Sequence, residues 1–140
     1  MTVPCEGADE AVRVFEAITS VTPEDCVVDE RFDRLIFLVP AAEVSRAIGP
    51  DGATVERVEA RLETGVEVVA DAPTPAEFVA EALSPATVRN VTVSENGDVV
   101  AYVEVDHEEL GLAIGREGRN VHAAKRLAAR RFGVDDVQFT

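Results

Sequence analysis

The chain is poor in several residue types, and each shortage excludes a class of protein. It has 140 residues with no tryptophan, one tyrosine and two cysteines. No run of about 20 apolar residues is present, so we expect no membrane-spanning helix and no membrane partner. The N-terminal stretch MTVPCEGADE has neither a basic nor an apolar segment. We therefore expect no secretory signal and a cytoplasmic location.

Cysteine and histidine are too few and too scattered for a metal centre. A structural zinc needs about four ligands at close spacing, whereas Cys5, Cys26, His107 and His122 lie far apart. A disulfide is disfavoured in a reducing cytoplasm. Neither histidine lies beside a serine or cysteine in a nucleophile motif, and the carboxylates show no metal-ligand spacing. We predict no catalytic residues, no metal or cofactor, and no small-molecule substrate.

Lysine is almost absent: Lys125 is the single lysine, and the other twelve basic residues are arginines. The formal net charge is −14. Such acidity opposes phosphate binding, which normally uses a basic surface. The same composition also fits a proteome adapted to high salt, where the Debye length falls to about 3 Å at 1 M and a charged surface stays hydrated. We favour this interpretation over a protein that avoids nucleic acid or binds basic partners.

The chain contains one glycine-bracketed turn twice. The stretches AIGPDGAT (residues 47–54) and AIGREGRN (residues 113–120) are 66 residues apart (113 minus 47). Their flanks match at the same offset, IFLVPAAEVSRAIG with YVEVDHEELGLAIG. This period is too long for the usual solenoid repeat. We interpret it as a tandem duplication, with domains over residues 1–71 and 72–140.

Hydrophobic periodicity predicts the order α-β-β-α-α-β in each copy. The first copy predicts helices over residues 8–19, 41–48 and 54–63, and strands over 26–28, 35–39 and 66–70. The second predicts a helix from 74 to about 84, strands over 88–93 and 99–105, a short helix after 106, a helix over 119–132 and a strand over 134–139. Antiparallel hairpin strands with a third strand returning after two helices predict a mixed three-stranded sheet, covered by helices, of the α+β class.

Three local signals fix details of the second copy. TPAE at Thr74–Glu77 predicts a helix N-terminus with a capping box. Asn96-Gly97 predicts a hairpin turn. In DHEE, Asp106 and Glu109 are spaced as a second capping box.

A Gly-x-x-Gly turn between two helices has both a structural and a functional interpretation. Gly115 can end a helix with positive φ, and Gly118 can permit close packing. Alternatively, the first N–H groups of the following helix bind a phosphate, and the missing Cβ atoms admit a sugar-phosphate backbone. Arg116, Arg119 and Asn120 would add charge and hydrogen bonds.

A GxxG turn within an αββααβ frame resembles the type II KH domain, whose loop clamps about four nucleotides of RNA. AIGREGRNVHAAKRLA (residues 113–128) is similar to the last KH domain of the NusA family, and two adjacent KH domains resemble its short archaeal members. The resemblance implies two tandem type II KH domains, single-stranded RNA binding in transcription elongation or termination, and RNA polymerase as a partner. The implied RNA-binding residues are Ile114, Gly115, Arg116, Glu117, Gly118, Arg119, Asn120, Val121, Lys125 and Arg126.

The helix after the second turn adds two further expectations. On a helical wheel one face carries Arg119, His122, Arg126 and Arg130, and another carries Val121, Ala124 and Ala128. We expect the first face to meet RNA and the second to meet the core. Leu112, Ile114 and Val121 are candidates for an apolar groove that holds bases.

The first turn departs from the family pattern. Pro50 removes an amide, and Asp51 places a negative charge where a phosphate would lie. The weaker RNA-binding candidates are Ile48, Gly49, Pro50, Asp51 and Gly52. Two other functions therefore stay open: a KH protein of ribosome assembly or RNA decay, and a protein-interaction module that has lost RNA binding.

Overall fold

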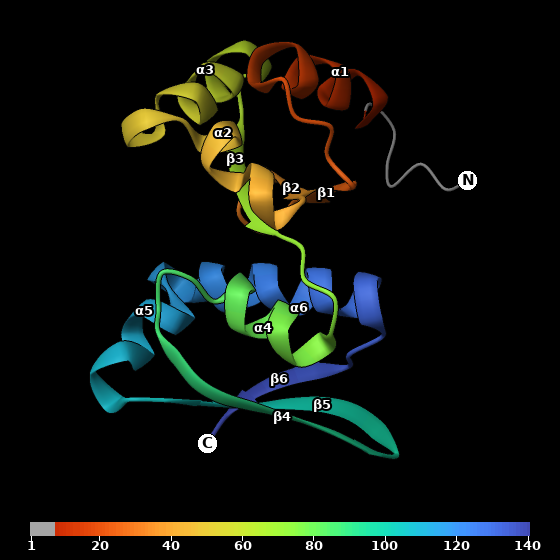
Figure 1. Cartoon of the computed structure of the whole chain (residues 1–140), viewed down its shortest axis with the longest axis vertical. Helices are drawn as coiled ribbons and strands as arrows, with labels where there is room; N and C mark the ends of the chain where they lie inside the picture. Colours follow the sequence, from red (N-terminus) through yellow and green to blue (C-terminus); the bar gives the residue numbers. More distant parts are fainter. Residues whose placement is uncertain (1–7) are drawn as a thin grey trace. The chain divides into compact units, whose positions relative to one another are not determined.

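The computed structural model describes residues 8–140, so Cys5 and the first seven residues lie outside the described part. The chain divides into two compact units, Met1–Asp71 and Ala72–Thr140, each described by itself (Figure 1). Both units have the predicted order α-β-β-α-α-β. Within residues 8–140 no helix is long and apolar enough to cross a membrane.

The first unit agrees closely with the predicted elements. It consists of α1 (Ala8–Thr19), β1 (Asp25–Asp29), β2 (Arg34–Val39), α2 (Val44–Ile48), α3 (Ala53–Leu62) and β3 (Gly65–Ala70), with 3₁₀ turns at Ala41–Glu43 and Pro50–Gly52. The sheet has the order β1-β2-β3, with β1 antiparallel and β3 parallel to β2. This confirms the mixed α+β sheet.

Helices of the first unit pack on one face of that sheet. Phe15 of α1 stacks on Phe37 of β2, with ring centroids 4.1 Å apart. These two rings belong to the hydrophobic core, which also contains Cys26 at 1% exposure, Ala47 of α2 and Val58 of α3. A thiol in these apolar surroundings behaves as a small hydrophobic side chain. Among residues 8–140 no group of three or more metal-ligating side chains is present.

The second unit repeats this architecture. It consists of α4 (Pro75–Ala82), β4 (Val88–Asn96), β5 (Asp98–Val105), α5 (Leu110–Ile114), α6 (Arg119–Phe132) and β6 (Asp136–Phe139), with 3₁₀ turns at His107–Glu109 and Arg116–Gly118. The β4–β5 hairpin turns at Gly97, where φ is +88°, and β6 runs parallel to β5. Helices α4 and α6 cover one face of the sheet (Figure 1). Phe78 of α4 meets Phe132 of α6 edge-on at 5.6 Å.

The two predicted capping boxes had different outcomes. At α4 the Thr74 hydroxyl accepts a hydrogen bond from the Glu77 amide at 3.2 Å, as predicted. At the second box Asp106 is the N-cap residue, as predicted, but its side chain makes no cap hydrogen bond. Its carboxylate instead accepts a hydrogen bond from Arg89 of β4, and this bond raises the pKa of Arg89. The local sequence could not show that a neighbouring strand would supply this partner.

Helix α6 has the predicted bounds but a different buried face. Its buried side chains are Ala123, Ala124, Leu127 and Ala128. Val121 is half-buried, and His122, expected on the exposed basic face, is also half-buried. The buried stripe therefore lies slightly around the helix from the predicted one, because Ala123 and Leu127 rather than Val121 complete the contact with the core.

Candidate nucleic-acid interface

The two turns have almost the same backbone. In Gly49–Gly52 and Gly115–Gly118 the first glycine has φ/ψ of 76°/173° and 79°/171° respectively. The third residue has φ/ψ of 53°/28° and 58°/21°, and the last glycine 76°/12° and 82°/11°. The difference between the turns is therefore in their side chains and not in their path.

The first glycine of each turn is required by packing within the protein. Its φ and ψ fall in a region that essentially only glycine occupies. A Cβ at Gly115 would lie 2.6 Å from the Cβ of Asn120 and 2.8 Å from its amide nitrogen, and one at Gly49 would lie 2.2 Å from Oγ1 of Thr54. The expectation that this missing Cβ admits a ligand was therefore wrong, because the next helix fills the space.

The second glycine faces a different environment. A Cβ at Gly118 would meet no other atom within 4 Å, and one at Gly52 would touch only Val55, at 3.9 Å. Positive φ, 82° at Gly118, accounts for the residue type. Space beside Gly118 is free of protein atoms, so a ligand backbone can approach the turn on this side.

Backbone amides of the second turn divide into two groups. Gly115 N–H donates to a carbonyl of the preceding helical turn at 2.9 Å, and Gly118 N–H donates to the carbonyl of Gly115 at 3.1 Å. The N–H of Arg119 donates to the carbonyl of Arg116. Within residues 8–140 the amides of Arg116 and Glu117 have no backbone acceptor. The two middle residues of the turn therefore have amides that are left for an anion.

Charged side chains surround these two amides. Arg116 and Arg119 are exposed, and Nη2 of Arg119 lies 3.8 Å from Oε1 of Glu117. Glu117 is 73% exposed, so this ion pair is screened by water and weak. An incoming phosphate would compete with Glu117 for Arg119, while Arg116 has no carboxylate partner among residues 8–140.

Asn120 has a structural task that the sequence did not reveal. Its Nδ2 lies 3.0 Å from the carbonyl oxygen of Leu83, 3.3 Å from that of Leu112 and 3.2 Å from that of Ala113. These carbonyls belong to the ends of α4 and α5, which lack intrahelical donors. Asn120 therefore joins α6 to both helices, and its amide nitrogen is used inside the protein.

Apolar side chains lie next to the second turn. Leu112 of α5 is 48% exposed, and Ile114 and Val121 are half-buried. Ile48 has the matching half-buried place before the first turn. An exposed leucine beside two half-buried side chains offers apolar contact area, which agrees with the expected groove position.

The remaining two basic candidates lie further along α6. Nζ of Lys125 lies 3.4 Å from Oδ1 of Asp136, at the start of β6. The pKa of Asp136 is lowered, mainly by a hydrogen bond from Gln138, with Lys125 adding a smaller part. Lys125 follows Arg119 by six residues, and at about 100° per residue it lies on another side of the helix. The structure therefore does not bring Lys125 to the turn. Arg126 is half-buried.

The residue of the first unit that matches Lys125 also contacts the third strand. Glu59 holds the matching place in α3 (125 minus 66), and its Oε2 accepts a hydrogen bond from the amide of Val66 in β3 at 2.9 Å. In both units this helix position therefore reaches the third strand, by different chemistry.

The first turn offers less to an anion. Pro50 has no N–H, so of its two middle residues only Asp51 can donate an amide. Asp51 carries a negative charge, as Glu117 does in the second turn, so acidity at this position does not distinguish the two. What the first turn lacks is an amide and a cation at its second position, and a second cation at Ala53, where α6 has Arg119.

Comparison with known proteins identifies the family. Residues 75–138 match the NusA-like second KH domain. The chain is 51% identical over 134 residues to the probable transcription termination protein NusA of Halococcus morrhuae, covering 94% of this chain and 95% of that protein. The chain belongs to the NusA family. Members of this family are transcription factors and not enzymes, in agreement with the prediction of no catalytic activity.

Two further comparisons support the fold and the composition. The chain is 51% identical over 135 residues to the probable NusA protein of Halobacterium salinarum, covering 96% of each. Both relatives come from halophilic archaea, which agrees with the interpretation of the charge of −14 as an adaptation to salt. A solved structure described as the crystal structure of APE1850 matches with a TM-score of 0.84 at 33% identity, covering 94% of this chain and 96% of that one.

Proposed function

We propose that the chain is a single-stranded RNA-binding factor of transcription elongation and termination, acting with RNA polymerase in the cytoplasm. Its units, residues 1–71 and 72–140, are two tandem type II KH domains. The turn Gly115–Gly118 of the second unit clamps the RNA backbone. Support for the partners comes from the names of the relatives and from the match to the NusA-like KH domain.

The observation that carries the clamp is the pair of adjacent amides without a backbone acceptor. The N–H groups of Arg116 and Glu117 are consecutive, in a turn whose third residue has left-handed φ and ψ. Successive amides in such turns form concave anion sites. The Arg116 side chain adds a cation beside them, and the absence of atoms near Gly118 leaves room for the sugar-phosphate chain.

Bases would then rest on apolar side chains. Aromatic stacking cannot be the main device in a chain with no tryptophan and one tyrosine. Leu112, with Ile114 and Val121 beside it, offers apolar contact on the α5 side of the turn. In high salt, where counterion release supplies less affinity, these contacts and the amide hydrogen bonds carry a larger share of binding.

A titration of labelled single-stranded RNA tests the clamp. The variant Arg116→Pro with Glu117→Asp gives the second turn the sequence of the first. The variant loses one amide and one cation. Because a hydrogen bond to a charged group contributes about 1.5–3 kcal/mol, RNA binding should weaken by about ten- to a hundredfold. The control, Arg57→Gln, likewise removes one positive charge, from an exposed site outside both turns. Equal affinity of wild type and turn variant would reject the clamp.

Polymerase binding separates this function from a KH protein of ribosome assembly or RNA decay. Purified RNA polymerase from a halophilic archaeon, mixed with the full chain in molar KCl, should form a complex that co-elutes in size-exclusion chromatography. Absence of that complex, with RNA binding intact, would favour the other RNA pathways.

A further inference from the structure

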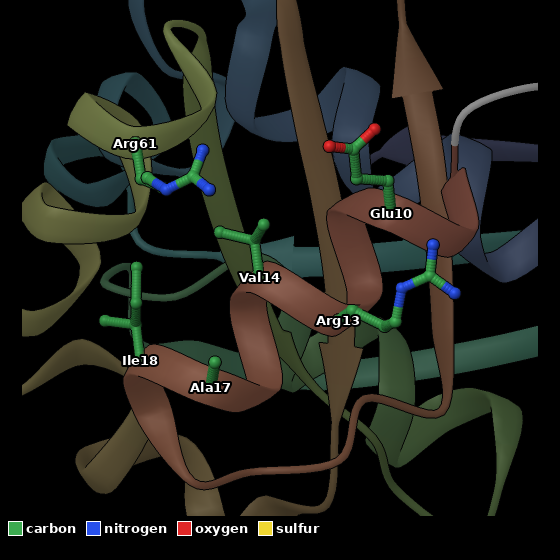
Figure 2. A pocket seen from close by; sticks show the side chains of 6 residues that line it. All are labelled: Glu10, Arg13, Val14, Ala17, Ile18 and Arg61. Atoms are coloured by element: carbon green, nitrogen blue, oxygen red, sulfur yellow. The ribbon is translucent and has the colours of Figure 1, made fainter.

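Helix α1 has a second apolar stripe, which lines a pocket beside α3, and Ile18 at the end of this stripe also packs against the core. Toward the core, the helix buries Ala11 and Phe15. On another side Val14, Ala17 and Ile18 line a surface pocket of about 330 Å³ between α1 and α3 (Figure 2). Ala17 is exposed, and the other two are half-buried.

The sister unit has charged side chains at two positions of this stripe. Helices α1 and α4 both end five residues before the first strand of their unit, so they can be aligned on the one fully buried phenylalanine of each. In that alignment Val14 corresponds to Glu77, and Ile18 corresponds to Glu81. Both glutamates are exposed. The same helix position is thus charged and solvated in one unit and apolar in the other.

Two arginines border the pocket. Arg61 reaches from α3 toward Val14, and Arg13 lies on the other side of α1 in the view of Figure 2. Neither forms an ion pair with a carboxylate of residues 8–140, although Glu10 also lines the pocket. The residue of α6 that matches Arg61 (61 plus 66) is Leu127, which is 1% exposed. The second unit fills this place with a core side chain, and the first unit presents a cation there.

We propose that this pocket docks an acidic, amphipathic segment of a partner protein. An apolar side chain of the segment would enter between Val14, Ala17 and Ile18, and its carboxylates would pair with Arg13 and Arg61. From Glu10 to Ile18 the pocket lining covers eight helical steps (18 minus 10) of about 1.5 Å each, or about two helical turns. That length suits a short helix lying in a groove, a common mode of peptide recognition.

The charged residues of α1 and α3 favour a peptide over a nucleic acid as the occupant of the pocket. Helix α1 carries three acidic residues with Arg13, and α3 carries two with Arg57 and Arg61. Five carboxylates beside three arginines repel a long polyphosphate chain that would run along both helices. The pocket itself is lined by two arginines and one glutamate, a net charge of +1 (2 minus 1), which suits a single carboxylate. The site lies wholly in the first unit and uses no residue of either GxxG turn, so it is independent of the proposed RNA function.

The test is an NMR titration of the ¹⁵N-labelled full chain with two designed peptides. Both have leucine at every third or fourth position; one has glutamate on its flanks and the other has lysine. The acidic peptide should shift the amide signals of α1 and the second half of α3, and bind at least about tenfold more tightly than the basic one. The variants Arg61→Glu and Val14→Glu should each weaken it by about tenfold.

The control variant is Arg57→Glu, which makes the same charge change one turn away on α3 and outside the pocket. It should leave the affinity for the acidic peptide within about twofold, and circular dichroism confirms that each variant is folded. No binding of the acidic peptide, equal binding of both peptides, or equal loss in Arg57→Glu would overturn the proposal. Shifts at Val14 and Ile18 with single-stranded RNA in place of the peptide would overturn it as well.

Discussion

The turns Gly49–Gly52 and Gly115–Gly118 follow the same path and carry different chemistry. The φ angles of their first, third and last residues agree within 6°. The second position is proline in one and arginine in the other, so one turn offers a single free amide and the other offers two beside a cation. The comparison teaches that a GxxG turn is first a helix corner, and that binding chemistry is added to this corner by its middle residues.

The largest expected effect is the difference in protein stability between substitutions of the two glycines of the second turn. Gly115→Ala combines a glycine-only backbone with a Cβ 2.6 Å from that of Asn120, so we expect about 3 kcal/mol lower free energy of unfolding. Gly118→Ala meets no atom within 4 Å and should cost about 1 kcal/mol for positive φ. Denaturant unfolding in molar KCl measures both. Equal losses would mean that the contact with Asn120 is not tight.

The first turn should gain affinity when it receives the side chains of the second. Starting from a chain whose second turn is disabled by Arg116→Pro with Glu117→Asp, we add Pro50→Arg with Asp51→Glu. The restored amide and cation should raise RNA affinity by about tenfold, measured by fluorescence anisotropy. If affinity does not rise, the decisive difference lies outside the turns, with Ala53 in place of Arg119 as the next candidate.

We expect Asn120 to contribute more to the stability of the fold than to the affinity for RNA. Asn120→Ala removes the donor that three carbonyl oxygens share, at 3.0, 3.3 and 3.2 Å, and should lower the free energy of unfolding by about 1–3 kcal/mol. Thr54→Ala at the matching place of the first unit should cost less. RNA affinity measured on the folded fraction should fall less than in the Arg116 variant. A loss of affinity without loss of stability would assign Asn120 to the RNA after all.

The smallest expected effect concerns the charges around the second turn. Glu117→Gln removes a carboxylate 3.8 Å from Arg119 and should raise RNA affinity about two- to threefold at low salt, with less effect in molar KCl. Lys125→Ala, at a residue that faces Asp136, should leave the affinity unchanged. A larger loss with Lys125→Ala than with Arg116→Ala would place the RNA on the β6 side of α6.

Local patterns in the sequence determined the fold to a large extent. Apolar periodicity gave α1 and α6 their observed bounds, and Asn96-Gly97 marked the β4–β5 hairpin, because these features depend on neighbouring residues. Contacts between distant segments could not be predicted. The bond of Asp106 to Arg89 of β4 is such a contact, since strand pairing brings its partners together.

For the candidate site, too, local features could be predicted from the sequence and contacts between distant segments could not. The turn itself, with Arg116 and Arg119 exposed, was predicted from the repeat. The bonds of Asn120 to the ends of α4 and α5, and the reach of Lys125 to β6, needed the three-dimensional packing of α6. No single-residue pattern indicated which amides of the turn stay without an acceptor, because that depends on backbone angles.

The most direct test observes both turns in one experiment. Amide signals of the ¹⁵N-labelled full chain are followed while a short single-stranded RNA is added in molar KCl. The account predicts large downfield shifts of the Arg116 and Glu117 amides, which mark hydrogen bonds to phosphate, and little change at Asp51. Equal shifts in both turns, or none at Arg116 and Glu117 while RNA binds elsewhere, would contradict the claim that the second turn is the clamp.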